Sequence, residues 1–287
     1  MPIQVQTATL QPGATKSFNF SDTITQRMVG ISAYSLSYGS STDHHVETVS
    51  VSLVVNQSGN TLQVTAHATM VDANGHNLSA SSSSITVVAV AWVGLDDPGL
   101  KLANANGIGN GGTSSPIVLS NTNPSILQAA LSGFYLSYGS TDHHMETSAA
   151  AVGTSLNGNE ASITGVVYMY DENGHNASQA TVDGGMFANT DPSLGAYVLA
   201  TDSLQNKSET LTFPAAVNNV YPLLSSFKVQ FQSNHDHHVK TMGASLTVSH
   251  QAGSNTATVT GAAVLKDNSG NSQDNNVSNV TGFVIGF

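Results

Sequence analysis

The sequence predicts an all-β protein that consists of three tandem antiparallel β-sandwich repeats with about six strands each. Three observations lead to this fold class. One motif occurs three times, apolar and polar residues alternate in many short stretches, and turns rich in Gly and Asn separate those stretches. No segment shows the 3.6-residue apolar period of an amphipathic helix. Many short strands without helices are typical of sandwiches and barrels.

The repeated motif is an Asp-His-His triplet that stands just before a run of strand-forming residues. Its copies are YGSSTDHHVET, YGSTDHHMET and FQSNHDHHVKT, which begin at Tyr38, Tyr138 and Phe231. They recur about every 95 residues, and this period takes precedence over the two domains that length alone would suggest. We therefore expect one β-sandwich repeat in each of the segments 1–98, 99–195 and 196–287. Each repeat is large enough for a modest core and gains stability by packing on its neighbours.

The first strand of the shared pattern alternates large apolar residues with small polar ones. In repeat one, Tyr34, Leu36 and Tyr38 share one side of this strand, and serines occupy the other side. The same columns in the other repeats hold Phe134, Leu136, Tyr138, Phe227, Val229 and Phe231. A stripe that is kept in all three repeats predicts a shared apolar core.

Further strands follow the triplet in each repeat. In repeat one they are expected at 46–55, 62–72 and 84–94, and a looser strand at 15–21 precedes them. The strand at 46–55 has an apolar face and a face of small residues, which fits a neighbouring backbone layer and a solvent-facing surface equally well. The strand at 62–72 runs into Asn74-Gly75, a hairpin-turn signal. The Gly- and Asn-rich stretches 95–116 and 189–206 are expected to be linkers.

Composition excludes several classes of function. The net charge is −11 and the seven Lys and Arg residues do not cluster, so the chain lacks the cations that nucleic-acid binding needs. The absence of cysteine excludes disulfides, thiolate metal sites and a cysteine nucleophile. No apolar run approaches about 18 residues, so no membrane-spanning segment is expected. The N-terminus lacks a signal-peptide pattern, and we favour an extracellular or released protein without a classical signal peptide.

Part of repeat one resembles a known family. Within residues 28–94 the chain has the segment MVGISAYSL, a polar loop, VSVSLVV, NTLQVTAHATMVDANG and ITVVAVAWVG, which contains Ala91-Trp92. This order resembles the H-type lectin domain of snail agglutinins and slime-mould discoidins, and the other two repeats resemble it more weakly. The resemblance implies six-stranded sandwiches that form trimers and bind galactose-type sugars in grooves between subunits.

For this chain, the resemblance implies an intramolecular pseudo-trimer and a multivalent carbohydrate-binding protein whose partner is a glycan or glycoconjugate. A further homo-oligomer is compatible with it. No sugar-contacting residue is transferred, because the family has no standard Asp-His-His triplet at the start of the second strand. The triplet therefore calls for an explanation of its own.

The two histidines of each triplet are expected on opposite faces, because side chains alternate along a strand. His44, His143 and His237 share the parity of the small face, and His45, His144 and His238 share that of the apolar face. If the small faces surround a pseudo-threefold axis, three equivalent imidazoles meet there. We take His44, His143 and His237 as the first candidate set of metal ligands, and His45, His144 and His238 as the second.

Three interpretations of the triplet stay open. The histidines bind Zn, Ni or Cu while Asp43, Asp142 and Asp236 orient the imidazoles, or they have a structural role at the start of the strand. Alternatively, they contact a ligand or act as a pH switch. His76 and His175 are expected to be exposed turn residues. Asp72, Asp171 and Asp267 are expected to cap their own turns.

We predict that the protein is not an enzyme and has no catalytic residues. The motifs G-x-S-x-G and H-E-x-x-H and the P-loop are absent. Threefold retention of a site fits multivalent binding or assembly better than catalysis, for which one copy suffices. The alternative to a lectin-like protein is a non-enzymatic structural or toxin component, of the bacterial insecticidal or phage type, that uses the β-module for assembly.

Overall fold

The computed structural model describes residues 2–39, 42–191 and 196–287, and the predicted boundary at residue 195 lies outside them. Repeat one contains β1 (Ile3–Leu10), β2 (Thr15–Asn19), β3 (Ile24–Ser37), β4 (Thr48–Ser58), β5 (Thr61–Val71) and β6 (Ser84–Val93). Repeat two contains β7 (Leu100–Gly109), β8 (Ile117–Val118), β9 (Ile126–Ser137), β10 (Thr147–Asn157), β11 (Glu160–Tyr170) and β12 (Gln179–Asn189). Repeat three contains β13 (Tyr197–Ala200), β14 (Lys207–Val217), β15 (Val220–Gln230), β16 (Thr241–His250), β17 (Ser254–Lys266) and β18 (Asn279–Gly286).

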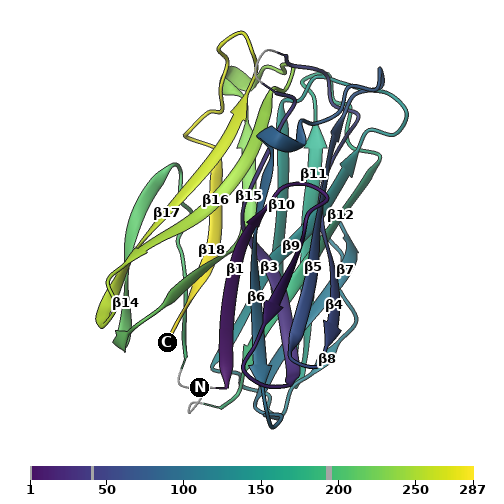
Figure 1. The fold of residues 1–287 in the computed structure, drawn as a ribbon. Coiled ribbons are helices and arrows are strands. Elements are labelled where there is room, and N and C mark those ends of the chain that lie inside the picture. The colour runs from purple at the N-terminus through teal and green to yellow at the C-terminus, as the bar shows by residue number, and fades with distance from the viewer. Residues whose placement is uncertain (1, 40–41, 192–195) are drawn as a thin grey trace.

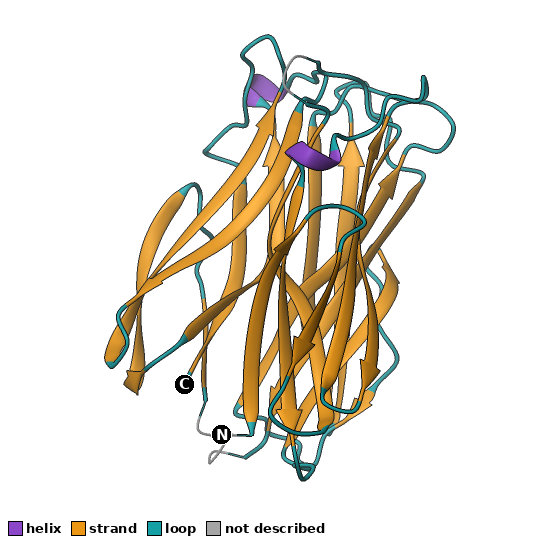
Figure 2. Cartoon of the chain, in the orientation of Figure 1, coloured by secondary structure: helices purple, strands orange, loops and turns teal. Residues whose placement is uncertain are grey.

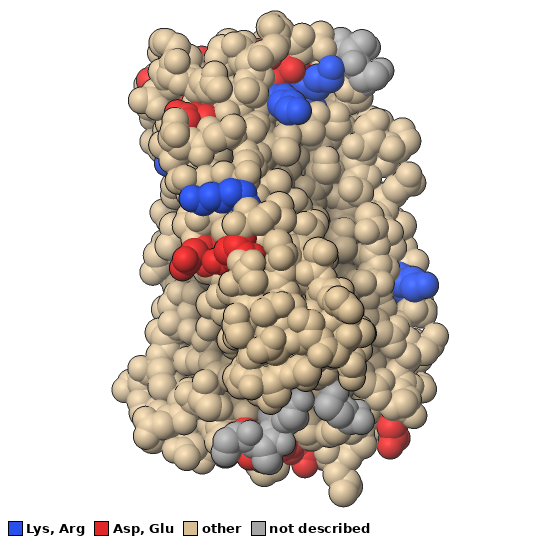
Figure 3. All heavy atoms as spheres, turned by 90° about the vertical axis from the view of Figure 1, so that its left-hand side faces the viewer, with Lys and Arg blue, Asp and Glu red and all other residues tan. Residues whose placement is uncertain are grey.

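The predicted fold class is confirmed. The strands form three six-stranded antiparallel sheets, and the helices of the described residues are two single 3-10 turns, η1 (Ala80–Ser82) and η2 (Gln232–Asn234). Figures 1 and 2 show long strands that run between two ends of the molecule, where the loops gather. Charged side chains are few and scattered on the face drawn in Figure 3.

Each sheet combines three strands of one repeat with three strands of another. The orders are β1-β6-β3-β16-β17-β14, β2-β5-β4-β9-β12-β7 and β13-β18-β15-β10-β11-β8. At the middle of each sheet, two repeats meet through the pairs β3–β16, β4–β9 and β10–β15. These three joints link the repeats in a closed ring, which makes the chain an intramolecular pseudo-trimer.

Close approach at these joints explains part of the small-residue face. A Cβ atom on Gly243 of β16 would lie 2.7 Å from the carbonyl oxygen of Tyr34 on β3. A Cβ atom on Gly133 of β9 would lie 2.6 Å from the carbonyl oxygen of Val51 on β4. Neither position has room for a side chain, because the paired strand of another repeat approaches it directly.

Two local predictions were wrong. The expected linkers contain strands, since β7 and β13 fall within them and pair with β12 and β18 at the edges of two sheets. The turn at Asn74-Gly75 does not join two paired strands, because β5 and β6 belong to different sheets. It closes with a single bridge between Val71 and Asn77, and the chain then crosses to the other sheet.

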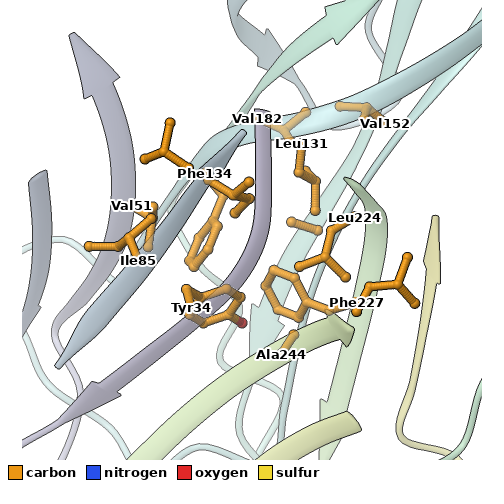
Figure 4. Close-up of a cluster of buried hydrophobic side chains, with 14 of the residues drawn as sticks. Tyr34, Val51, Ile85, Leu131, Phe134, Val152, Val182, Leu224, Phe227 and Ala244 are labelled. Atoms are coloured by element: carbon orange, nitrogen blue, oxygen red, sulfur yellow. The ribbon is translucent and has the colours of Figure 1, made fainter. Parts of the chain in front are cut away.

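The predicted aromatic stripe forms the centre of the core. Tyr34, Phe134 and Phe227 come from three repeats and point toward one another (Figure 4). Their ring centroids are 5.1–5.2 Å apart in all three pairs, the range in which tilted and edge-to-face contacts are favourable. All three are buried, so the hydrophobic effect holds the repeats together at the axis.

Replacing Phe134 by Ala is expected to lower the free energy of unfolding by about 3–5 kcal/mol, because it leaves a cavity between three repeats. Urea unfolding followed by circular dichroism measures the change. Val54→Ala is the control, since Val54 is 49% exposed on β4 and should cost less than about 1 kcal/mol. Equal losses for the two variants would contradict a core shared at the axis.

Candidate metal centre

Backbone pairing brings the three Asp-His-His triplets together at one end of the molecule. The triplets lie in the loops that precede β4, β10 and β16, at the top of Figure 1. Isolated β-bridges connect these loops in pairs: His44 with Val239, Val46 with His143, and Met145 with His237. Each bridge has two backbone hydrogen bonds of 2.8–3.1 Å. The loops of the three repeats are therefore held in fixed positions around the axis.

His45, His144 and His238 meet at the centre of these loops. Their ring centroids are 4.5, 4.6 and 4.7 Å apart. One nitrogen from each ring lies within 4.8 Å of the corresponding nitrogens of the other two. We call these three residues the axial cluster. The structure thus brings together the second of the two histidine sets that the sequence offered.

The three aspartates of the triplets contact the axial cluster at the Nδ1 atoms of its imidazoles. In each case the carboxylate approaches the Nδ1 atom of a histidine that belongs to another repeat. The pairs are His45 with Asp142 at 3.3 Å, His144 with Asp236 at 3.2 Å, and His238 with Asp43 at 3.5 Å. The predicted aspartates therefore do face imidazoles, although each one faces the neighbouring repeat.

Two of these aspartates are themselves fixed by backbone groups. The second carboxylate oxygen of Asp142 accepts a hydrogen bond from Ala73 N, and that of Asp43 accepts one from Asn268 N. An acceptor held against Nδ1 favours the tautomer that carries its proton there, which leaves Nε2 as the free lone pair. His45 and His144, which make this hydrogen bond, thus keep Nε2 available for a ligand, and His238 has Asp43 in the same arrangement at 3.5 Å.

The axial cluster is one of the groups that could hold a metal ion. Neutral imidazole is a preferred ligand of Zn, Ni and Cu, and a carboxylate on the other ring nitrogen is the usual support for such a ligand. Nitrogens that share a zinc ion at about 2.0–2.1 Å lie roughly 3.3 Å apart, so the imidazole nitrogens, which lie within 4.8 Å of one another, would have to move closer to share an ion. The axial histidines are about 40% exposed, so an ion has access from solvent.

His44, His143 and His237 do not meet on the axis. Each lies in a separate cluster with an aspartate of its own repeat, and we call these the outer clusters. In repeat one, Nδ1 of His44 is 3.5 Å from Asp72 Oδ2, and Nδ1 of His76 is 2.5 Å from the same oxygen. The imidazole rings of His44 and His76 stack with centroids 4.0 Å apart.

Repeat two repeats this arrangement, and repeat three departs from it. Asp171 Oδ2 lies 3.3 Å from His143 Nδ1 and 2.6 Å from His175 Nδ1. In repeat three, Asn271 occupies the turn position and hydrogen-bonds Asp267, and His237 Nδ1 is 3.8 Å from that aspartate. The first two outer clusters have three groups that could hold an ion. The sequence signal for them is a histidine four residues after an aspartate. The structure adds that the aspartate is buried.

Asp72, Asp171 and Asp267 cap their own turns, as predicted. Oδ1 of Asp72 accepts hydrogen bonds from Asn74 N at 3.0 Å and His76 N at 2.8 Å. Burial alone would raise the pKa of Asp72, but the hydrogen bonds from the His76 side chain and backbone outweigh it, and the pKa is lowered. The pKa of Asp171 is lowered for the same reasons, with His175 as the donor.

Together, the fold and the clusters define a triplicated β-module with three histidine-rich sites near one another. No protein-family model, curated protein or solved structure matches this chain. Among the described residues, no helix is long and apolar enough to cross a membrane.

Replacing Asp72 by Ala is expected to lower the free energy of unfolding by about 1–3 kcal/mol at pH 7, because turn amides lose their buried acceptor. The folded pKa of Asp72 is lowered, so this contribution is complete above the unfolded value of about 3.9 and is lost as pH falls through the folded pKa. Urea unfolding at pH 7 and near pH 3 measures both effects.

Asn74→Ala is the matched control for the Asp72 variant. Asn74 lies in the same turn with an exposed side chain, so its loss should have little effect at either pH. A difference between wild type and Asp72→Ala that grew on acidification would contradict the lowered pKa.

Proposed function

We propose that this chain is a non-enzymatic metal-binding protein in which His45, His144 and His238 hold one divalent transition-metal ion on the pseudo-threefold axis. The observation that carries the proposal is the axial cluster: three imidazoles from three repeats with centroids 4.5–4.7 Å apart, each with a carboxylate at Nδ1. Zn, Ni and Cu share this ligand preference.

The role of the ion is to fasten the three repeats at their loop end. Each ligand comes from a different repeat, so an ion that binds all three opposes the separation of their loops. An ion that binds only the folded chain stabilises it in proportion to the logarithm of its concentration, by about 2.7 kcal/mol at a hundred times Kd. The aromatic core holds the strands together at their middle, and the ion would hold together the loops that carry the triplets.

A structural role is favoured over catalysis because the three ligands are equivalent by the internal symmetry. A catalytic zinc site binds three protein ligands and keeps an open position beside an acid or base group. In the axial cluster, the nearby carboxylates are engaged by the imidazole Nδ1 atoms and, for Asp43 and Asp142, by backbone amides. They support the ligands and are not free to move protons.

Carbohydrate binding by this rigid triplicated module stays a prediction, since it follows from the resemblance to H-type lectins. So does its alternative, a structural or toxin component that uses the module for assembly. A glycan array probed with metal-loaded protein distinguishes the two, because only the lectin-like protein should bind sugars.

Replacing the axial histidines tests the metal proposal directly. Wild-type protein loaded with Zn, Ni or Cu and then desalted should contain about one tightly bound ion per chain by elemental analysis. His45→Ala and the triple replacement of His45, His144 and His238 should lose that ion, because a single pair of imidazoles binds weakly. Chelation should lower the midpoint of thermal unfolding of the wild type but not of the triple variant.

The control is His67→Ala, since His67 lies on β5 and belongs to none of the clusters. This variant should keep the ion and the response to chelator. A wild-type chain that holds no ion after loading with each of the three metals would refute the proposal. Metal that survives the triple replacement and disappears with Asp72→Ala would move the site to an outer cluster.

A further inference from the structure

Arg27 is the only arginine of the chain, and it lies in an unusual place for a cation. It belongs to β3, where it shares the face of Val29 and Ile31. Those two residues are completely buried in the core. The strand therefore directs the guanidinium toward the space between two sheets, at the end of a core-facing column.

A cavity of about 240 Å³ opens beside Arg27, where repeats one and two meet. Its walls come from β3, β4, β7 and β9, and its lining residues are Arg27, Val29, Leu53, Val55, Asn104, Asn106 and Ser132. A wider hollow of about 460 Å³ shares Arg27 and Asn104 with it and continues along Gln26, Gln57 and Lys101. We call the two together the Arg27 groove. Combined, they have the size of ordinary small-molecule sites.

Among the described residues, no protein group neutralises Arg27. Within the part of the chain that the structure describes, its guanidinium has neither an ion pair nor a hydrogen bond. Burial lowers the pKa of Arg27, and no carboxylate acts against this effect. One carboxylate, Asp96, lines the wider hollow, but its Oδ1 accepts a hydrogen bond from Gln26 at 2.7 Å. A partly desolvated cation without a partner is costly, and a ligand anion would remove this cost.

Among the polar side chains that line the cavity, one is held in place by hydrogen bonds and two are available to a ligand. Asn104 is fixed, because its side chain accepts a hydrogen bond from Val29 N at 3.0 Å and donates one to Val29 O at 2.8 Å. The side chains of Asn106 and Ser132 make no hydrogen bond among the described residues. Both line the same cavity as Arg27, so they are available to ligand hydroxyl groups.

The fold itself does not require a cation at this position. Each repeat has a bulge two residues before its axial aromatic residue, at Ser32, Ser132 and Ser225, which aligns the three strands residue by residue. In that alignment, Arg27 corresponds to Leu127 in repeat two and Val220 in repeat three. Both counterparts pack against the apolar core. Repeat one therefore has a charged residue where the same fold is satisfied by an aliphatic one.

We propose that the Arg27 groove binds the carboxylate of an acidic sugar. A guanidinium and a carboxylate form two parallel hydrogen bonds, which gives this pairing its geometric specificity. The amide and hydroxyl groups of Asn106 and Ser132 match the hydroxyl groups of a sugar ring, and Leu53 and Val55 offer apolar contact to its carbons. Gln57 adds its Oε1 as an acceptor, since its Nε2 already donates to Ile24 O at 2.9 Å. Lys101 adds a second positive charge in the wider hollow.

This site is separate from the axial cluster and does not depend on the metal proposal. It lies toward the start of β3, whereas the axial cluster lies in the loop that follows the end of that strand. Binding should therefore be unchanged by chelators, so failure of either proposal leaves the other intact.

Titration calorimetry with galacturonic acid, galactose and acetate tests the proposal, with glucuronic acid and N-acetylneuraminic acid as further acidic sugars. Galactose is the uncharged match of galacturonic acid, and acetate carries the carboxylate without the sugar. Wild-type protein should bind at least one acidic sugar tenfold or more tightly than it binds galactose or acetate. Arg27→Leu introduces the residue of repeat two, so it should fold normally and weaken this binding at least tenfold.

Two further variants complete the test. Arg27→Gln keeps a polar side chain without charge and should behave like Arg27→Leu, which covers the case in which the leucine variant fails to fold. Lys207→Ala removes an exposed cation on β14, outside the groove, and should bind as the wild type does. Equal binding of acid and neutral sugar, equal binding of acetate, undiminished binding by both Arg27 variants, or no binding of any acidic sugar would each overturn the proposal.

Discussion

The pairing of strands between repeats is the interaction on which the rest of the structure depends. Three equivalent joints, β3–β16, β4–β9 and β10–β15, complete the three sheets, and each joint is made by two repeats. No sheet is formed by one repeat alone, so every sheet requires a second repeat that supplies half of its strands. The ring of joints sets Tyr34, Phe134 and Phe227 around one axis, and the same ring extends into the loops, where bridges such as His44–Val239 position the histidines. The candidate metal centre is thus a consequence of how the sheets are completed.

The sequence predicted those features of the fold that depend on local alternation, and it could not predict those that depend on pairing. The stripe of Tyr34, Leu36 and Tyr38 is buried as expected, because a period of two is maintained along a continuous strand. Sharing of sheets was not predictable, since β5 and β6 are neighbours in sequence and yet lie in different sheets. The strand β7 was missed because its Gly- and Asn-rich segment has low strand propensity. The strand β13 was missed because its four apolar residues are a short run inside a polar stretch, and both strands form at an available sheet edge.

The choice between the two histidine sets shows where the parity argument fails. It assumed that the alternation of β4 continues back through the triplet, which would put His44 on the same side as Thr48. In the structure, β4 begins at Thr48, and a bend at Glu47 separates it from the bridge residue Val46, which is fully buried. The small face was also expected at the axis, whereas the apolar face of β4 is the buried one: Val49 and Val51 are fully buried, and Ser50 and Ser52 are partly exposed. His45, which has the parity of that apolar face, faces the axis, and His44 turns toward Asp72. The sequence predicted that the aspartates support imidazoles. It did not predict that each aspartate faces a histidine of another repeat, because that pairing depends on the closed ring of repeats.

Residues that differ between the three repeats occur in the outer clusters and at Arg27, but not in the axial cluster. A ligand on the axis contacts all three repeats at once, so loss of one imidazole would damage the whole site, and the axial residues are the same in every copy: His45, His144 and His238. A site away from the axis belongs to one or two repeats, and change in one copy leaves the other copies intact. The outer clusters follow this logic, since Asn271 replaces the histidine in repeat three. Arg27 follows it as well, because its counterparts Leu127 and Val220 are partly buried aliphatic residues that pack against the core. Loss of an axial imidazole in any one repeat would therefore affect all three, whereas loss of an outer-cluster histidine or of Arg27 affects the repeat that carries it.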